Sequence, residues 1–231
     1  MLRRLATVLV AVAAVGPSTA AAAPPVLPDL FTPAPNIATP LPHIGRTRTS
    51  ICGPIVAPSQ DAVQSILGND ATLDDLLVKL PTLHMDQAPR PKQETQLAAL
   101  RKTASDLQLT AREGLRDTAR MRAYAETLND SGKRYVLNAY VDALEDALHT
   151  QDKAGADLAR GLVIAEARRS AYQSDLEMIQ QMPAQAGTQS LDDPGTYKEL
   201  TDAVSDRLGD YRNQTKQTEK TIAKRVSDVG C

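Results

Sequence analysis

The sequence predicts an all-α protein: an elongated antiparallel three-helix coiled-coil bundle with a short, broken N-terminal helical segment packed alongside. Only 3% of the 231 residues are aromatic, with one Phe and no Trp, so Ala and Leu supply most of the apolar side chains. Such a composition is typical of long helices in a thin bundle. Three long stretches also repeat apolar residues at alternating spacings of three and four, which is the seam of a left-handed coiled coil.

The long stretches cover residues 92–129, 131–182 and the chain from about 195 to its end. Their short connections predict an up-down-up arrangement, because a short link between helices forces them antiparallel. The middle stretch is the longest, so we expect it to overhang the others or to kink at Gly155 or Gly161. Its stripe comprises Leu137, Val141, Leu144, Leu148, Gln151, Gly155, Leu158, Leu162, Ala165, Arg169, Tyr172, Leu176 and Ile179.

The N-terminal residues have the pattern of a secretory signal peptide over 1–23. Arg3 and Arg4 precede an apolar run that is too short to span a membrane, and small residues at 20–23 offer a cleavage site. Seven prolines follow within 24–43. Because proline lacks an amide donor, we expect a Pro-rich tether and lead-in segment over 24–58.

The bundle domain is expected to cover residues 59–231. It would start with two short helices, 59–68 and 73–80, which form the broken N-terminal segment. Ser59 and Thr72 are the expected N-caps of these helices, and Pro81 is the expected end of the second.

Two cysteines, Cys52 and Cys231, occur in this chain, which the signal-peptide pattern predicts to be exported. An even number of cysteines in that setting predicts one disulfide. An intermolecular bridge and two free thiols are the open alternatives, since Cys231 is the last residue. In the predicted bundle, Cys231 lies where the first two long helices meet, so the segment 53–91 must span the bundle for the two cysteines to pair.

The sequence predicts no catalytic residue, no cofactor and no metal. It contains no phosphate loop, nucleophile elbow or metal-binding Cys or His motif. Glu145 and His149 share a helix face, but a di-metal bundle needs Glu-x-x-His on two helices and two further Glu. A solvated helix face is therefore the favoured interpretation of this pair.

Two rows of basic residues form a candidate patch for an anionic partner. The rows follow helical spacing on two stretches that should run parallel, with acidic residues interleaved. Ordinary solvated faces are the alternative. The rows are Arg112, Arg116 and Arg120, and Lys216, Lys220 and Lys224.

Polar residues interrupt the apolar stripe of the middle stretch at Gln151 and Arg169. A polar residue within a coiled-coil seam can fix the register of the helices, which is the favoured interpretation here. Otherwise these positions lie where the bundle is open or docks another molecule.

The segment Ile44-Gly-Arg-Thr-Arg-Thr-Ser-Ile-Cys52, between a Pro-rich tether and long helices, resembles a family of secreted bacterial helical proteins. The resemblance implies export and a helical fold, and it implies no activity. In architecture alone, the chain also resembles periplasmic helical subunits of type IV secretion pili, although it lacks Gln-rich helices.

The sequence thus predicts an exported, non-catalytic protein that binds or scaffolds at the cell envelope or outside the cell. Its partner would be another protein, or a second copy of the chain, bound through the helix faces. We expect no transmembrane segment and no nucleic-acid partner. Removing Arg3 and Arg4 leaves 24 basic against 28 acidic residues, which gives no basic footprint for nucleic acid. The alternatives are a ligand- or metal-binding bundle, or a subunit of a secretion apparatus.

Overall fold

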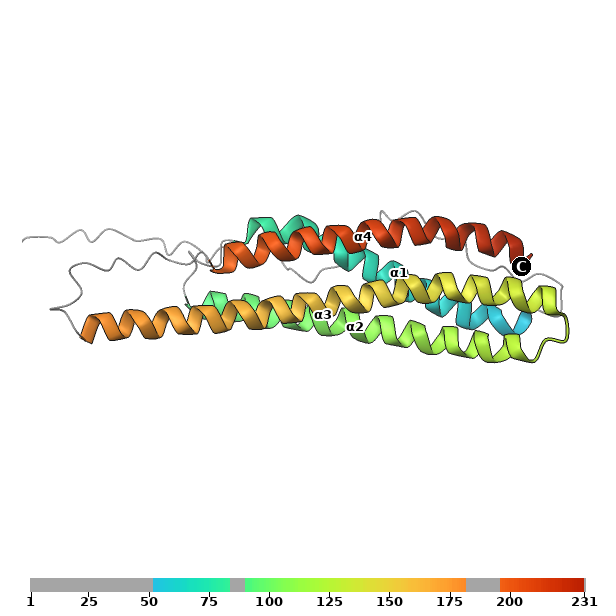
Figure 1. Ribbon diagram of the computed structural model, residues 1–231, viewed down its shortest axis with the longest axis horizontal. Coiled ribbons are helices and arrows are strands. Elements are labelled where there is room, and N and C mark those ends of the chain that lie inside the picture. Colours follow the sequence, from blue (N-terminus) through green and yellow to red (C-terminus); the bar gives the residue numbers. More distant parts are fainter. Residues whose placement is uncertain (1–51, 84–89, 182–195, 231) are drawn as a thin grey trace, which may run out of the picture.

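The computed structural model describes residues 52–83, 90–181 and 196–230, and all regular elements within them are helices. The helices are α1 (Gly53–Lys79), α2 (Arg90–Glu126), α3 (Ser131–Gln181) and α4 (Thr196–Val229), with a 3-10 turn η1 (Leu80–Thr82) after α1. Consecutive helices run in opposite directions along one long axis (Figure 1). The predicted all-α, antiparallel bundle is therefore confirmed.

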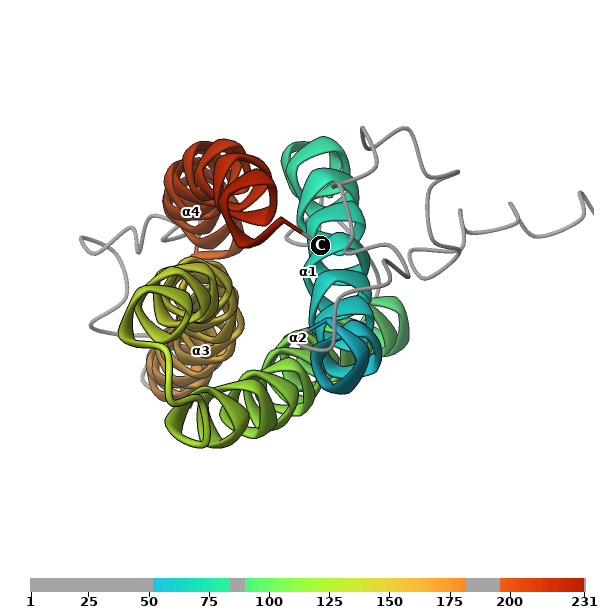
Figure 2. The same ribbon diagram turned by 90° about the vertical axis from the view of Figure 1, so that its right-hand side faces the viewer.

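Each helix packs mainly against its neighbours in the chain. Helix α3 lies along both α2 and α4, and α1 packs chiefly on α2 (Figure 2). Figure 1 shows α1 crossing the bundle obliquely, so that its second half and η1 reach the beginning of α4. Helices α2 and α4 consequently occupy opposite corners of the bundle, with α1 and α3 between them.

The N-terminal segment differs from its prediction, because it forms one continuous helix that starts at Gly53. Proline is tolerated in the first turn of a helix. At Pro58, inside the helix, the burial of apolar residues such as Ile55 and Ile66 outweighs the cost of the missing amide hydrogen bond. Ser59 is buried within the helix rather than capping it. Thr72 donates its hydroxyl proton to the Gly68 carbonyl, at 3.0 Å, and so caps no amide.

Helix α3 has 51 residues, or roughly 76 Å at 1.5 Å per residue, and projects past the beginnings of α2 and α4 (Figure 1). The predicted overhang is present, whereas α3 continues as one helix through both glycines where a kink was expected. These glycines allow close packing instead. A Cβ at Gly155 would lie 2.8 Å from the Ala104 carbonyl oxygen, and a Cβ at Gly161 would lie 2.8 Å from Leu200.

The core consists of two apolar clusters, one in each half of the rod. The first contains Ile55, Met121, Leu144 and Ile222, and the second contains Leu73, Leu100, Leu158 and Leu208, together with their neighbours. The predicted stripes supply most of these side chains. Each cluster contains residues from all four helices, so each half of the bundle is held together by its own apolar contacts.

The predicted signal peptide (1–23), residues 24–51 of the tether, and Cys231 lie outside the described residues. Cys52 is buried at the start of α1, next to the first cluster. Val229, near the end of α4, packs against the same cluster. Within the described chain, no helix combines the length and the apolar character that crossing a bilayer requires.

Candidate functional site: a buried polar layer and a groove

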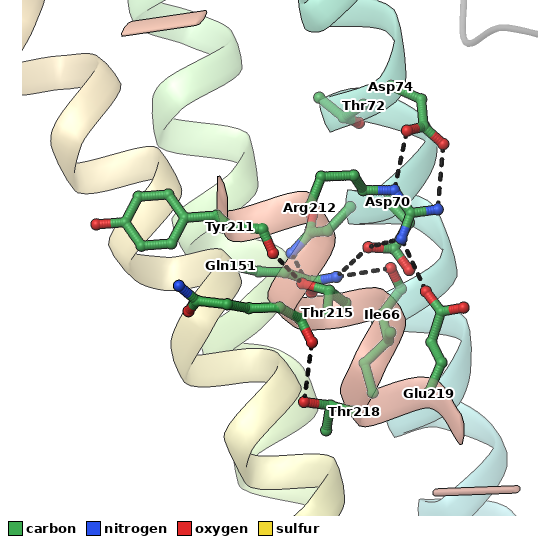
Figure 3. Close-up of polar contacts among 12 residues, drawn as sticks. Ile66, Asp70, Thr72, Asp74, Gln151, Tyr211, Arg212, Thr215, Thr218 and Glu219 are labelled. Atoms are coloured by element: carbon green, nitrogen blue, oxygen red, sulfur yellow. Dashed lines mark hydrogen bonds and ion pairs between the residues drawn. The ribbon is translucent and has the colours of Figure 1, made fainter. Parts of the chain in front are cut away.

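A layer of polar side chains lies at mid-length, between the two apolar clusters. It contains Asn69 and Asp70 of α1, Gln151 of α3, and Arg212 and Thr215 of α4, all of them buried. Figure 3 shows Asp70, Gln151, Arg212 and Thr215 converging from three helices. Polar groups removed from water are costly unless they are hydrogen-bonded, so the partners of this layer determine what it does.

Gln151 and Asn69 connect helices α1, α2 and α3. The Gln151 amide donates to the Ile66 carbonyl and to Asp70 Oδ1, both at 2.9 Å. The Asn69 amide donates to Gln151 Oε1 at 3.2 Å and to the carbonyl of Leu107, on α2, at 3.1 Å. These bonds fit only one axial position of each helix, so the register interpretation of Gln151 agrees with its surroundings.

Arg212 forms ion pairs with three carboxyl groups (Figure 3). Its guanidinium binds Asp74 with two hydrogen bonds, Nε–Oδ1 at 2.9 Å and Nη2–Oδ2 at 3.2 Å. Nη1 lies 2.8 Å from Glu219 Oε1 and 3.3 Å from Asp70 Oδ1. A bidentate pair with a buried arginine ties α4 to α1 with defined geometry.

The three carboxyl groups differ in their exposure to solvent. The side chain of Asp74 is 46% exposed, that of Glu219 is 20% exposed and that of Asp70 only 1%. Burial, followed by hydrogen bonding to Glu219, raises the pKa of Asp70 to about 8, against the opposing effect of Arg212. Asp70 therefore holds a proton at neutral pH, because one guanidinium cannot compensate three carboxylates in a site removed from water.

Arg212 stays charged in this environment. Burial alone would lower the pKa of the guanidinium, but hydrogen bonding to Asp74 and to Glu219 raises it above its ordinary value. The layer is thus a fixed positive charge surrounded by acids of unequal proton affinity.

A groove of about 330 Å³ lies between the second half of α3 and the first half of α4. Its apolar lining includes Ile164, Leu200 and Val204. Arginines and carboxylates form the rim, as in the exposed pair of Arg168 with Glu199, whose charged atoms are 2.9 Å apart. Ligand sites combine an apolar floor with a few placed polar groups in this way.

Exposed apolar side chains lie close to this groove. Of the six large apolar residues that are exposed in the described chain, Val163 and Ile164 are 63% and 48% exposed, and Met178 further along α3 is 50% exposed. Beyond Ala165 the α3 stripe becomes half-exposed, at Tyr172, Leu176 and Ile179. Arg169, the second polar interruption of the stripe, lies 5.8 Å from the centre of the Tyr197 ring.

The Glu145–His149 pair does not form a ligand set. His149 is exposed, and Glu145 accepts a hydrogen bond from Arg122, at 2.7 Å. Arg122 also binds Asp142, at 2.7 Å, which ties α2 to α3 on the outside of the bundle. In the described parts of the chain, no three His, Cys, Asp or Glu side chains are arranged to hold a metal ion.

The six basic residues of the candidate patch are all exposed. Arg112 is paired with Asp152 at 3.1 Å, and Arg120 is paired with Asp117 at 2.8 Å. The two rows lie on α2 and α4, the opposite corners of the bundle in Figure 2. Binding of an anionic partner by these rows stays a prediction, and the placement of α2 and α4 does not join the rows into one surface.

Sequence reasoning identified Gln151 but missed the rest of the polar layer and the whole groove. Thr215 and Thr218 stand at stripe positions of α4, and aligning them with Gln151 across the antiparallel helices would have placed one polar level in the core. Val163 and Ile164 are apolar residues outside the stripe, which is the signal for an additional contact face.

The chain matches no protein-family model, no curated protein and no solved structure in the three comparisons made.

Proposed function

We propose that this chain is an exported, non-catalytic protein that acts by binding a helical partner in the α3–α4 groove. The observation that carries the proposal is the groove of about 330 Å³, whose lining includes the exposed side chain of Ile164 and adjoins the exposed Val163 in the chain. Exposed apolar side chains clustered beside an apolar groove are typical of interaction sites.

The occupant we propose is an amphipathic helix of a partner protein with acidic flanks. The half-exposed stripe of α3 beyond Ala165 continues the spacing that packs on α2 and α4, so another helix can pack on it in the same way. Three arginines (Arg160, Arg168 and Arg207) face two carboxylates at the rim of the groove. This excess of positive charge favours an acidic partner over a second copy, whose own groove has the same charge.

Two synthetic amphipathic helices with identical apolar stripes, one flanked by Glu and the other by Lys, would test the occupant. We expect the acidic peptide to shift the NMR signals of residues 157–168 and 199–207, and Ile164→Asp to weaken its binding. Leu109→Asp, at a 53% exposed position on α2, is the matched control and should leave binding unchanged. Equal binding of both peptides, or binding that ignores Ile164→Asp, would refute the acidic helix as the occupant.

Sedimentation of the purified protein distinguishes a second copy from a separate partner. We expect a monomer at micromolar concentration. A dimer that Ile164→Asp dissociates would reassign the groove to self-association.

Export and the disulfide are proposals that can be tested independently of the groove. Mass spectrometry of the protein recovered from the producing cell should show a mature N-terminus near Ala23 and, without reduction, a linked Cys52–Cys231 peptide. The proximity of Cys52 and Val229 to one apolar cluster supports this pairing. Two alkylatable thiols, or a retained N-terminus, would contradict the respective proposal.

A further inference from the structure

We propose that Asp70 is a proton-operated latch, which holds α1 against α4 when neutral and loosens that contact when it ionises. The latch lies at mid-length, away from the proposed groove, and does not depend on it.

The geometry around Asp70 explains why its carboxyl group holds a proton. Asp70 Oδ1 accepts a hydrogen bond from Gln151 at 2.9 Å and lies 3.3 Å from Arg212 Nη1. Oδ2 is equally buried, and in the described chain it accepts no hydrogen bond from any donor. A proton on Oδ2 turns this atom into a donor toward Glu219, whereas ionisation places two like charges side by side.

The groups that face Asp70 come from every helix of the layer. Helix α1 contributes Asp74, and α4 contributes Arg212 and Glu219. Helix α3 contributes the neutral amide of Gln151, and the described contact of α2 with the layer is the Leu107 carbonyl, which Asn69 binds. The guanidinium of Arg212 is shared among these three acids, so the charge of Asp70 acts directly on the contact between α1 and α4.

The sign of the pH dependence follows from where the proton is held. The unfolded chain releases it near the ordinary carboxyl value of 3.8, whereas burial and Glu219 raise the pKa in the folded protein to about 8. Between these values the native state binds one proton more than the unfolded state. This site therefore contributes stability at low pH that is lost as the pH rises toward 8, and the unfolding equilibrium constant should rise about tenfold per pH unit.

Urea unfolding of the full chain between pH 5 and pH 7 tests the linkage. In the wild type, Asp70 should raise the unfolding equilibrium constant about a hundredfold over this range, and Asp70→Asn should abolish this rise. Asp75→Asn, on the same helix but paired with Lys79, should keep the wild-type slope. An unchanged slope in Asp70→Asn would overturn the proposal.

Glu219→Gln provides a second variant at a less buried position. Removing this neighbouring charge should move the end of the pH-dependent range to lower pH, because Asp70 then releases its proton more easily. If stability changes over the same pH range in Glu219→Gln as in the wild type, Asp70 does not share its proton with Glu219.

Distances between spin labels on non-natural residues test the loosening itself. A label pair at Val78 of α1 and Lys216 of α4, both exposed, should show a longer or broader distance at pH 9 than at pH 6. The reference pair, Leu109 of α2 and Val163 of α3, should not change, and neither pair should change in Asp70→Asn. Identical α1–α4 distances at both pH values in the wild type would refute the latch.

Discussion

The contact between α2 and α3 and the contact between α1 and α4 are built from opposite chemistry. Where α2 meets α3, Gly114 and Gly155 leave so little space that an added Cβ would lie 2.7 Å from Leu148 or 2.8 Å from the Ala104 carbonyl. Where α1 meets α4 at mid-length, Arg212 joins Asp70 and Asp74. In the interior of the bundle the first contact depends on shape and the second on charge, so different substitutions and conditions should affect them.

Arg212→Ala should have the largest effect, a loss of about 3–5 kcal/mol in the free energy of unfolding. It leaves the carboxylates of Asp74 and Glu219 without their common cation, and it leaves the buried Asp70 without the guanidinium that lies 3.3 Å from it. Urea unfolding at pH 7 measures the loss.

Arg112→Ala is the matched control for this prediction. Its pairing with Asp152 joins α2 to α3 at the surface, where the arginine side chain is 59% exposed. Exposed pairs contribute about 0–1 kcal/mol, so the variant should stay within that range of the wild type. Equal losses in both arginine variants would mean that the polar layer has no special role in joining α1 to α4.

The difference between the two contacts also explains what the sequence could predict. Each apolar stripe of the three long helices lies within one continuous stretch of sequence, as Leu137, Val141 and Leu144 show. Fold class and helix bounds could therefore be predicted from its periodicity. The partners of Asp70 are separated from it by 81 residues at Gln151 and by 142 residues at Arg212. No local pattern gives such a pairing, because it depends on the axial position of each helix.

The continuous course of α1 was missed for a related reason. Local rules favour a break at Pro58 and at the polar residues Asn69 and Asp70. In the folded chain those polar side chains find hydrogen-bond partners on other helices, at the Leu107 carbonyl for Asn69 and at Gln151 for both. Hydrogen bonds to other helices thus allow residues that locally favour a break to lie inside a continuous helix.

Gly155→Ala should destabilise the protein by about 1–3 kcal/mol, because its Cβ would meet the backbone of α2 rather than a movable side chain. Gly68→Ala is the control within a helix, since an added Cβ there meets no atom within 4 Å. Alanine's higher helix propensity should make that variant about 0.5–1 kcal/mol more stable. Thermal unfolding of both variants measures the difference, and a stable Gly155→Ala protein would show that α2 and α3 can move apart.

Tyr140→Phe should have the smallest effect, a loss of about 1 kcal/mol. The Tyr140 hydroxyl lies 2.7 Å from Ser59 Oγ and links α3 to α1 inside the first apolar cluster. Tyr135→Phe, at a 71% exposed position on the same helix, is the control and should be neutral.

The same tyrosine gives this prediction a second readout at alkaline pH. Burial raises the pKa of Tyr140 above its ordinary value of 10.0, against the effect of the Ser59 hydrogen bond. The folded protein therefore keeps a proton that the unfolded chain releases, and stability from this group is lost as the pH rises above 10. Tyr140→Phe should remove that alkaline loss. If the variant keeps it, the phenol is not held in the apolar cluster, and the contact between α1 and α3 there is looser than the one between α2 and α3.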